Sequence, residues 1–197
     1  MANALTVAIV FAGWCLLTYG GYVRSDFLPA PHMVLTAAWK MAVKGTLFYD
    51  AAASVYVIFA GFLLASLLAI PLGILVGTFK IVEGLSEPII NFVRYLPVSA
   101  LIPLFILWIG IGTEEKIMVV FVGTFFQQVI LIADVSANVS RDLIDVSYTR
   151  GSKCRNVGGN ILVPASLPGI MDTLRITMGW AWTYLVGAEL VAANKGL

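Results

Sequence analysis

Five long apolar runs follow one another along this sequence, and short polar segments separate them. They cover residues 4–23, 52–78, 87–112, 116–137 and 169–193. Each run is about as long as the roughly 20 residues that an α-helix needs to cross the hydrocarbon core of a bilayer. The pattern therefore predicts an all-α, polytopic bundle of transmembrane helices that occupies residues 1–197 as a single domain.

A different pattern fills the segment between the first and second runs. Pro29 and Pro31 stop helix propagation, and Val34, Ala37 and Met41 then recur at helical spacing. A short helix with one apolar side lies along a membrane surface rather than across the membrane. We therefore expect an amphipathic helix on one membrane face.

Prolines and glycines distinguish two of the runs. Pro97 and Pro103 each remove a backbone donor from the third run, so we expect that helix to kink or break. Gly61, Gly73 and Gly77 lie in the second run, and small residues let helix backbones approach closely in lipid. The second run should therefore pack tightly against a neighbouring helix.

The composition agrees with a chain whose solvent is mostly lipid. Hydrophobic residues make up 60% of the sequence and charged residues 12%, whereas about a quarter of a soluble domain is charged. A net charge of +1 argues against a nucleic-acid partner, because no basic stripe stands out. Cys15 and Cys154 imply no disulfide, and His32 has no neighbours at ligand spacing, so we infer no metal.

Basic residues predict the orientation of the bundle. Arg141, Arg150, Lys153 and Arg155 all lie between the fourth and fifth runs. Short loops rich in lysine and arginine stay on the cytoplasmic side, so we place residues 139–168 inside the cell. Alternation then puts the N-terminus inside and the amphipathic helix outside.

The cytoplasmic segment carries helix signals of its own. Ser140 or Asp142 can cap a short helix, and Gly151 supplies the permissive backbone of a sharp turn. Pro164 and Pro168 should end a second short helix and redirect the chain into the fifth run. The segment therefore predicts a compact helix-turn-helix shaped to dock on a partner.

The spacing of Asp145-Val146-Ser147, Gly151, Ile161 and Pro164 resembles the Glu-Ala-Ala motif of the membrane subunits of ATP-binding-cassette (ABC) importers. The stretches LPAPHMVLTAA and RYLPVSALIPLFILWIGIG are similar to permeases of the nitrate/sulfonate/taurine type. The resemblance implies the type I importer permease fold, with an external amphipathic helix and a cytoplasmic coupling helix. The implied ATPase-coupling residues are Asp145, Val146, Ser147, Tyr148, Arg150, Gly151, Ile161 and Pro164. Members usually continue with a sixth span, which we expect to be missing from the C-terminus of this sequence.

The same resemblance implies a larger machine in the bacterial plasma (inner) membrane. Two permease copies, as a homo- or heterodimer, form the path, two ABC ATPase subunits bind the coupling loops, and an extracytoplasmic solute-binding protein delivers the solute. The solute is expected to be a small molecule with an anionic group, such as nitrate, a sulfonate, taurine or bicarbonate. The chain has no phosphate-binding loop, so it should be no enzyme and hold no cofactor, with ATP and Mg in the partner ATPase.

Polar side chains inside the runs are candidates for lining that path, because hydrocarbon forces them to face inward. The candidates are Ser99, Thr124, Gln127, Gln128, Asp134, Arg175, Thr183 and Glu189. Hydrogen bonds between helices, worth about 0.6–2 kcal/mol each, explain the two glutamines and Asp134 equally well. Arg94 and Arg175 could attract an anion, or could simply extend to the inner membrane surface or pair with a carboxylate such as Asp172.

Other classes of membrane protein fit the sequence less well. An ion-coupled secondary transporter is the main alternative, and the intramembrane acids Asp134 and Glu189 are its only support. No repeated pair of interrupted spans, which such transporters often have, is visible. A membrane scaffold would leave the polar faces unexplained, and an intramembrane enzyme would need a nucleophile–base pair or metal ligands.

Overall fold

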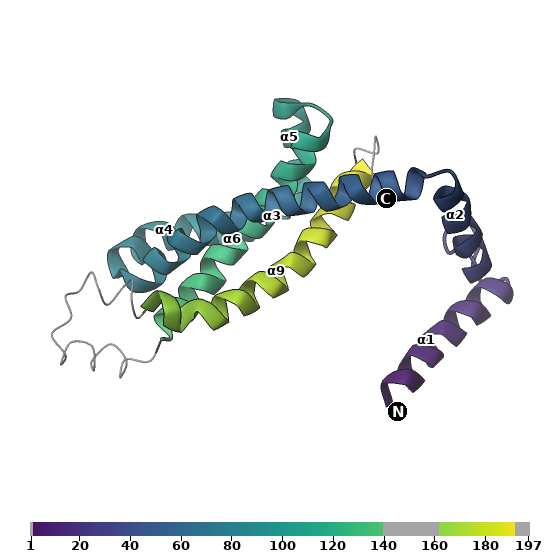
Figure 1. The fold of residues 1–197 in the computed structure, drawn as a ribbon, viewed down its shortest axis with the longest axis horizontal. Helices are drawn as coiled ribbons and strands as arrows, with labels where there is room; N and C mark the ends of the chain where they lie inside the picture. The colour runs from purple at the N-terminus through teal and green to yellow at the C-terminus, as the bar shows by residue number, and fades with distance from the viewer. Residues whose placement is uncertain (1, 140–161, 192–197) are drawn as a thin grey trace. The chain divides into compact units, whose positions relative to one another are not determined.

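The computed structural model describes residues 2–139 and 162–191, and in these ranges all regular secondary structure is α-helical, as predicted. The chain divides into two compact units, Met1–Ala52 and Ala53–Leu197, which are described separately. The helices, shown in Figure 1, are α1 (Ala2–Tyr19), α2 (Pro31–Val43), α3 (Thr46–Thr78), α4 (Lys80–Arg94), α5 (Val98–Ile109), α6 (Thr113–Ala137) and α9 (Val163–Val191).

The first unit contains two short helices. Helix α1 ends at Tyr19, four residues before the end of the predicted run, because Gly20 and Gly21 follow and Gly21 takes a positive φ of 71°. Its apolar part is shorter than a full crossing of the membrane. Helix α2 begins at Pro31, where the missing N–H of proline costs no helical hydrogen bond, and none of its residues is buried.

In the second unit, α3 lies closely against α6, and the glycines of α3 make this possible. A Cβ atom added to Gly61 would lie 2.8 Å from the carbonyl oxygen of Ile117, and one added to Gly73 would lie 2.8 Å from Ile132. Gly77 meets the backbone of Ala133 in the same way. The close packing predicted for these glycines is therefore confirmed. Because the contacts occur in the same order along both helices, α3 and α6 run parallel.

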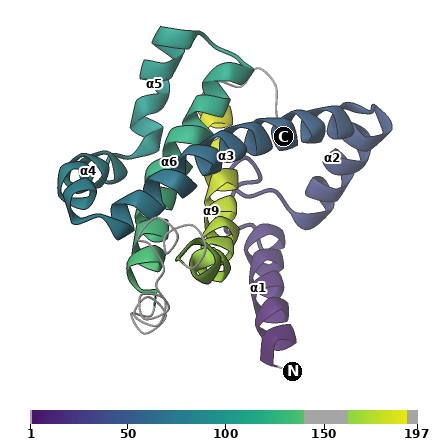
Figure 2. The same cartoon turned by 60° about the vertical axis from the view of Figure 1, so that its left-hand side comes forward.

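Helices α6 and α9 lie side by side and run antiparallel (Figures 1 and 2). Gln128 contacts Thr177 through a hydrogen bond, and Gly123 further back along α6 faces the ring of Tyr184 further along α9. Val135, near the end of α6, packs against Gly169 near the start of α9. The end of α6 and the start of α9 therefore lie at the same end of the unit.

Three clusters of buried apolar side chains hold the second unit together, and α6 contributes to each of them. Val120 packs with Ile58 of α3 and Leu185 of α9, while Val129 and Ile132 pack with residues of α3, α4 and α9. Val119 packs with Ile102 and Phe105 of α5 and with Ala188 of α9. Helix α6 is thus the central element of the unit.

The predicted break in the third run is present. Helices α4 and α5 meet at an angle of 91°, and Pro97 is the last residue before α5. The Val93 carbonyl, which loses its usual partner to Pro97, accepts a hydrogen bond from the N–H of Leu96 at 3.0 Å instead. The helical segment begins at Lys80 rather than at residue 87. Since α3 and α6 run parallel, the bent pair returns the chain from the end of α3 to the start of α6.

Among the described residues, α3 and α6 are long and apolar enough to cross a membrane, and the bent pair α4–α5 qualifies as a third crossing. Helix α9 begins six residues before the predicted fifth run. The prediction that Pro164 and Pro168 end a separate helix is wrong, because both lie inside the first turns of α9. Pro164 lies in the first turn, where the donor that it lacks would have no helical partner, so the helix can start before it. Pro168 lies in the second turn, and α9 continues through it with one backbone hydrogen bond fewer.

Candidate functional site

Two adjoining clefts lie where the α4–α5 corner meets α6 and α9. The first, which we call the corner cleft, has a volume of about 290 Å³, and its polar lining comes from Arg94, Tyr95, Gln127 and Tyr184. The second, the α6–α9 cleft, has a volume of about 300 Å³ and is lined by Gln127, Trp180, Thr183 and Tyr184. Gln127 and Tyr184 line both clefts, so the two spaces adjoin. The break at Pro97 opens the corner in which the first cleft lies.

Arg94 brings a formal charge into the corner cleft. Its Nη2 donates a hydrogen bond to the Tyr95 hydroxyl at 3.0 Å, and its guanidinium carbon lies 4.8 Å from the centre of the Tyr95 ring. Its Nε is buried and has no hydrogen-bond partner. No carboxylate of the described residues lies within ion-pair distance of Arg94. The other described residues that line either cleft carry no formal charge.

The neighbouring glutamines of α6 face different surroundings. Gln127 lines both clefts, whereas Gln128 is fully buried and donates a hydrogen bond from Nε2 to Thr177 Oγ1 at 3.2 Å. The Thr124 hydroxyl is also buried and donates to the Val120 carbonyl of its own helix at 2.8 Å. Gln128 and Thr124 are therefore buried in the packing of the helices. Of these three residues, only Gln127 faces the clefts.

Glu189 takes part in a buried polar cluster that joins three helices. Its Oε1 accepts a hydrogen bond from Ser54 of α3 at 3.0 Å and lies 3.8 Å from the Nζ of Lys116 in α6. The side chains of Lys116 and Glu189 are only 6% and 12% exposed. Glu115 is fully buried beside them, and neither of its carboxylate oxygens has a hydrogen-bond partner among the described residues.

The sequence analysis missed Ser54, Glu115 and Lys116 as members of this cluster. The available signal was that Glu115 and Lys116 lie at the start of the fourth apolar run and Glu189 near the end of the fifth. That signal identifies expensive charges, but it does not say which of them meet, because the pairing depends on the antiparallel arrangement of α6 and α9.

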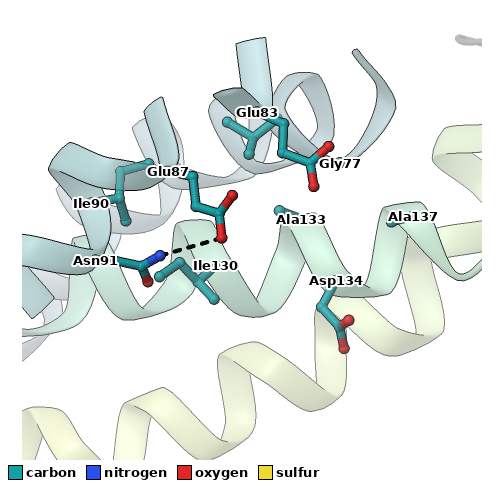
Figure 3. Close-up of a pocket in the computed structure, with 10 residues that line it drawn as sticks. Gly77, Glu83, Glu87, Ile90, Asn91, Ile130, Ala133, Asp134 and Ala137 are labelled. Atoms are coloured by element: carbon teal, nitrogen blue, oxygen red, sulfur yellow. Dashed lines mark hydrogen bonds between the residues drawn. The ribbon is translucent and has the colours of Figure 1, made fainter. Parts of the chain in front are cut away.

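An acidic pocket of about 210 Å³ lies at the other end of α6, between α3, α4 and α6 (Figure 3). Glu83, Glu87 and Asp134 line it, and each has a local partner: Lys80 at 2.8 Å, Asn91 at 3.4 Å and Asn138 at 3.0 Å. Asp134 is exposed and points away from the two glutamates (Figure 3). The described residues contain no cluster of potential metal ligands.

The remaining predicted residues are distributed as follows. Ser99, Arg175 and Thr183 are exposed on this chain, and of the three only Thr183 lines one of the two clefts. The predicted pairing of Arg175 with Asp172 is not among the ion pairs of the described residues. Most of the coupling residues lie outside the described residues: Asp145, Val146, Ser147, Tyr148, Arg150, Gly151 and Ile161. Pro164 is described and is exposed at the start of α9.

Comparison with known proteins gives consistent matches. Residues 69–197 match the family model described as binding-protein-dependent transport system inner membrane component. The chain is 39% identical to an ABC transporter permease protein of Brucella melitensis over 99% of its own length and 78% of that protein. It is 32% identical to the taurine transport system permease protein TauC of Escherichia coli, covering 98% of this chain and 72% of that protein.

The fold also has a solved counterpart. The structure of the MetNI methionine ABC transporter in an inward-facing conformation matches 79% of this chain and 78% of the compared chain, with a TM-score of 0.68. The sequences are 20% identical, so this likeness concerns the fold alone. It agrees with the expected type I importer permease fold.

Proposed function

This chain belongs to the family of binding-protein-dependent transport system inner membrane components, the permeases of ABC importers, and from that premise we propose that its two clefts line half of a path for a small anion. The expected solutes are nitrate, a sulfonate, taurine or bicarbonate. The relative that is named for taurine transport supports this class, because taurine carries a sulfonate group. The family places the chain in the inner membrane.

The observation that carries the proposal is the pair of adjoining clefts at the broken helix. Their polar groups come from α4, α6 and α9, and Gln127 and Tyr184 are shared between them. A helix broken in the membrane exposes backbone and side-chain polar groups that must line a cavity or be buried in protein. A second permease copy facing the clefts completes the path in this proposal.

Energy enters from partners. Each of the two permeases binds one ABC ATPase through its segment around Asp145–Gly151, and ATP-driven closure of the two ATPases moves the helices that line the clefts. An extracytoplasmic binding protein supplies the solute at the opposite face. ATP and Mg bind the ATPase subunits, so this permease performs mechanical rather than chemical work.

The test is reconstitution of the complete importer in proteoliposomes with ATP on the ATPase side. Uptake of labelled taurine or nitrate should require ATP and the binding protein. Tyr148→Asp or Gly151→Asp should abolish co-purification of the ATPase, because a new charge would enter the docking surface. Gly158→Asp, a glycine of the same segment outside the motif, is the matched control. Uptake that survives ATP depletion but collapses with the ion gradient would refute the proposal and favour a secondary transporter.

A further inference from the structure

Arg94 differs from every other cation in the part of the chain that the structure describes. Arg24, Lys80 and Lys116 each lie within 4 Å of a carboxylate. Lys40, Lys44 and Arg175 are in no such pair, but they are exposed and line neither cleft. Arg94 is only partly exposed, has a buried Nε without a partner, and faces the corner cleft.

A half-buried cation without a carboxylate has unfavourable energetics unless something else supplies negative charge. Burying a charge costs free energy that an opposite charge and hydrogen bonds normally offset. A single hydrogen bond to the Tyr95 hydroxyl and contact with the Tyr95 ring offset part of that cost. The remaining guanidinium donors form a planar fork, which matches two oxygens of a sulfonate, nitrate or carboxylate.

The rest of the lining suits the same ligand. The other described residues of the two clefts carry no negative charge that would repel an anion, and Gln127 has an amide that can donate. The hydroxyl of Tyr184 and the indole N–H of Trp180 are further donor groups in the lining. By contrast, the acidic pocket at the other end of α6 collects three carboxylates and would repel an anion.

We propose that Arg94 forms an anion-binding subsite in the corner cleft, where its guanidinium binds the sulfonate, nitrate or carboxylate group of the solute on its way through the permease. This inference rests on the proposed function for the identity of the solute. The anion-binding property itself belongs to Arg94 and its cleft, so it can be measured without knowing the solute.

The experiment measures quenching of Trp180 by iodide, an anionic quencher, and by acrylamide, a neutral one. The permease is purified with its ATPase partner in phosphatidylcholine nanodiscs, and the Trp180 signal is the component lost in Trp180→Phe. Arg94→Gln should lower the iodide quenching constant about two-fold, as expected for removing one charge from the adjoining wet cleft. The acrylamide constant should stay unchanged. Arg94→Lys should keep most of the iodide effect, and Arg175→Gln should keep all of it.

The outcomes separate the possibilities. Equal iodide quenching in the wild type and in Arg94→Gln would overturn the subsite. The subsite would also be overturned if both Arg94 variants lost iodide and acrylamide quenching to the same degree. Equal loss for a charged and a neutral quencher would show that Arg94 maintains the structure of the cleft rather than attracting anions. Loss of dimer assembly in Arg94→Gln on size-exclusion chromatography would mean that Arg94 pairs with a carboxylate of the second permease, which also overturns it.

Transport then links the subsite to the solute. In proteoliposomes, Arg94→Lys should raise the KM for taurine or nitrate about ten-fold with less change in maximal rate, because an ammonium cannot make the two parallel hydrogen bonds of the fork. An unchanged KM would overturn the role in solute binding. If no variant, including the wild type, shows ATP-dependent uptake while the quenching difference persists, the anion subsite stands and the importer function fails.

Discussion

The ion pair between Lys116 and Glu189 offers the sharpest test of the packing of α6 against α9. Opposite unit charges 3.8 Å apart attract by about 4 kcal/mol at an effective dielectric constant of about 20. Desolvation of two side chains that are nearly buried cancels much of this attraction, so the net value of the pair is small. Removing one partner is different, because the other charge stays buried, and this typically costs about 3–5 kcal/mol.

Three variants measure this coupling. Glu189→Gln keeps an oxygen that can accept the hydrogen bond of Ser54, so it removes the charge and little else. Lys116→Met keeps the length of the aliphatic stem, and the double variant removes both charges. Each single variant should lower the melting temperature by about 6–12 °C, taking about 3 kcal/mol and about 2–4 °C per kcal/mol. The double variant should lose less stability than the sum of the two single losses.

The assay is thermal unfolding of the detergent-purified permease, followed by fluorescence-detected size-exclusion chromatography after heating. Lys80→Met is the matched control, because Lys80 pairs with Glu83 on the exposed surface and should cost no more than about 1 kcal/mol. If the effects of the two single variants add in the double variant within about 0.5 kcal/mol, Lys116 and Glu189 do not interact and the reasoning is wrong.

Further substitutions test the packing and the backbone. Gly73→Ala should destabilise the protein by about 1–3 kcal/mol in the same thermal assay, because the new Cβ would lie 2.8 Å from Ile132. Gly84→Ala is the control: the space around Gly84 is open, so this substitution should stabilise α4 by up to about 1 kcal/mol. Gly110→Ala should cost about 1–3 kcal/mol, because φ is +94° there. Thr177→Val should cost about 0.6–2 kcal/mol by leaving the Gln128 amide without its acceptor, and adding Gln128→Met should restore most of that loss.

Much of the fold could be predicted from local rules. A chain in lipid must satisfy its backbone hydrogen bonds within each segment, so long apolar runs become helices wherever they occur. The break before α5 followed from Pro97, whose missing N–H acts within its own turn. Helix limits were less accurate, because α9 begins before Pro164 and continues through Pro168. Pro164 falls in the first turn, where the missing donor has no helical partner, whereas Pro168 is tolerated inside the helix.

The site was predicted only in part, and two neighbouring residues show why. Gln127 and Gln128 are chemically identical, but about 100° of helix rotation separates them, so only one can face the clefts. Which one does so depends on where α9 packs, and no local pattern contains that information. The same holds for Arg94 and Arg175, of which Arg94 alone lies in a cleft.

The sequence by itself determined that this chain is an all-helical membrane protein, because hydrophobic length, proline position and small residues act on the backbone nearby, while its resemblance to ABC importer permeases implied the function. Only the tertiary structure decided that Lys116 meets Glu189 and that Arg94 faces a cleft without a carboxylate. These residues lie on helices far apart in the sequence. The antiparallel packing of α6 and α9 brings Lys116 to Glu189, and the corner between α4 and α5 places Arg94 at the cleft.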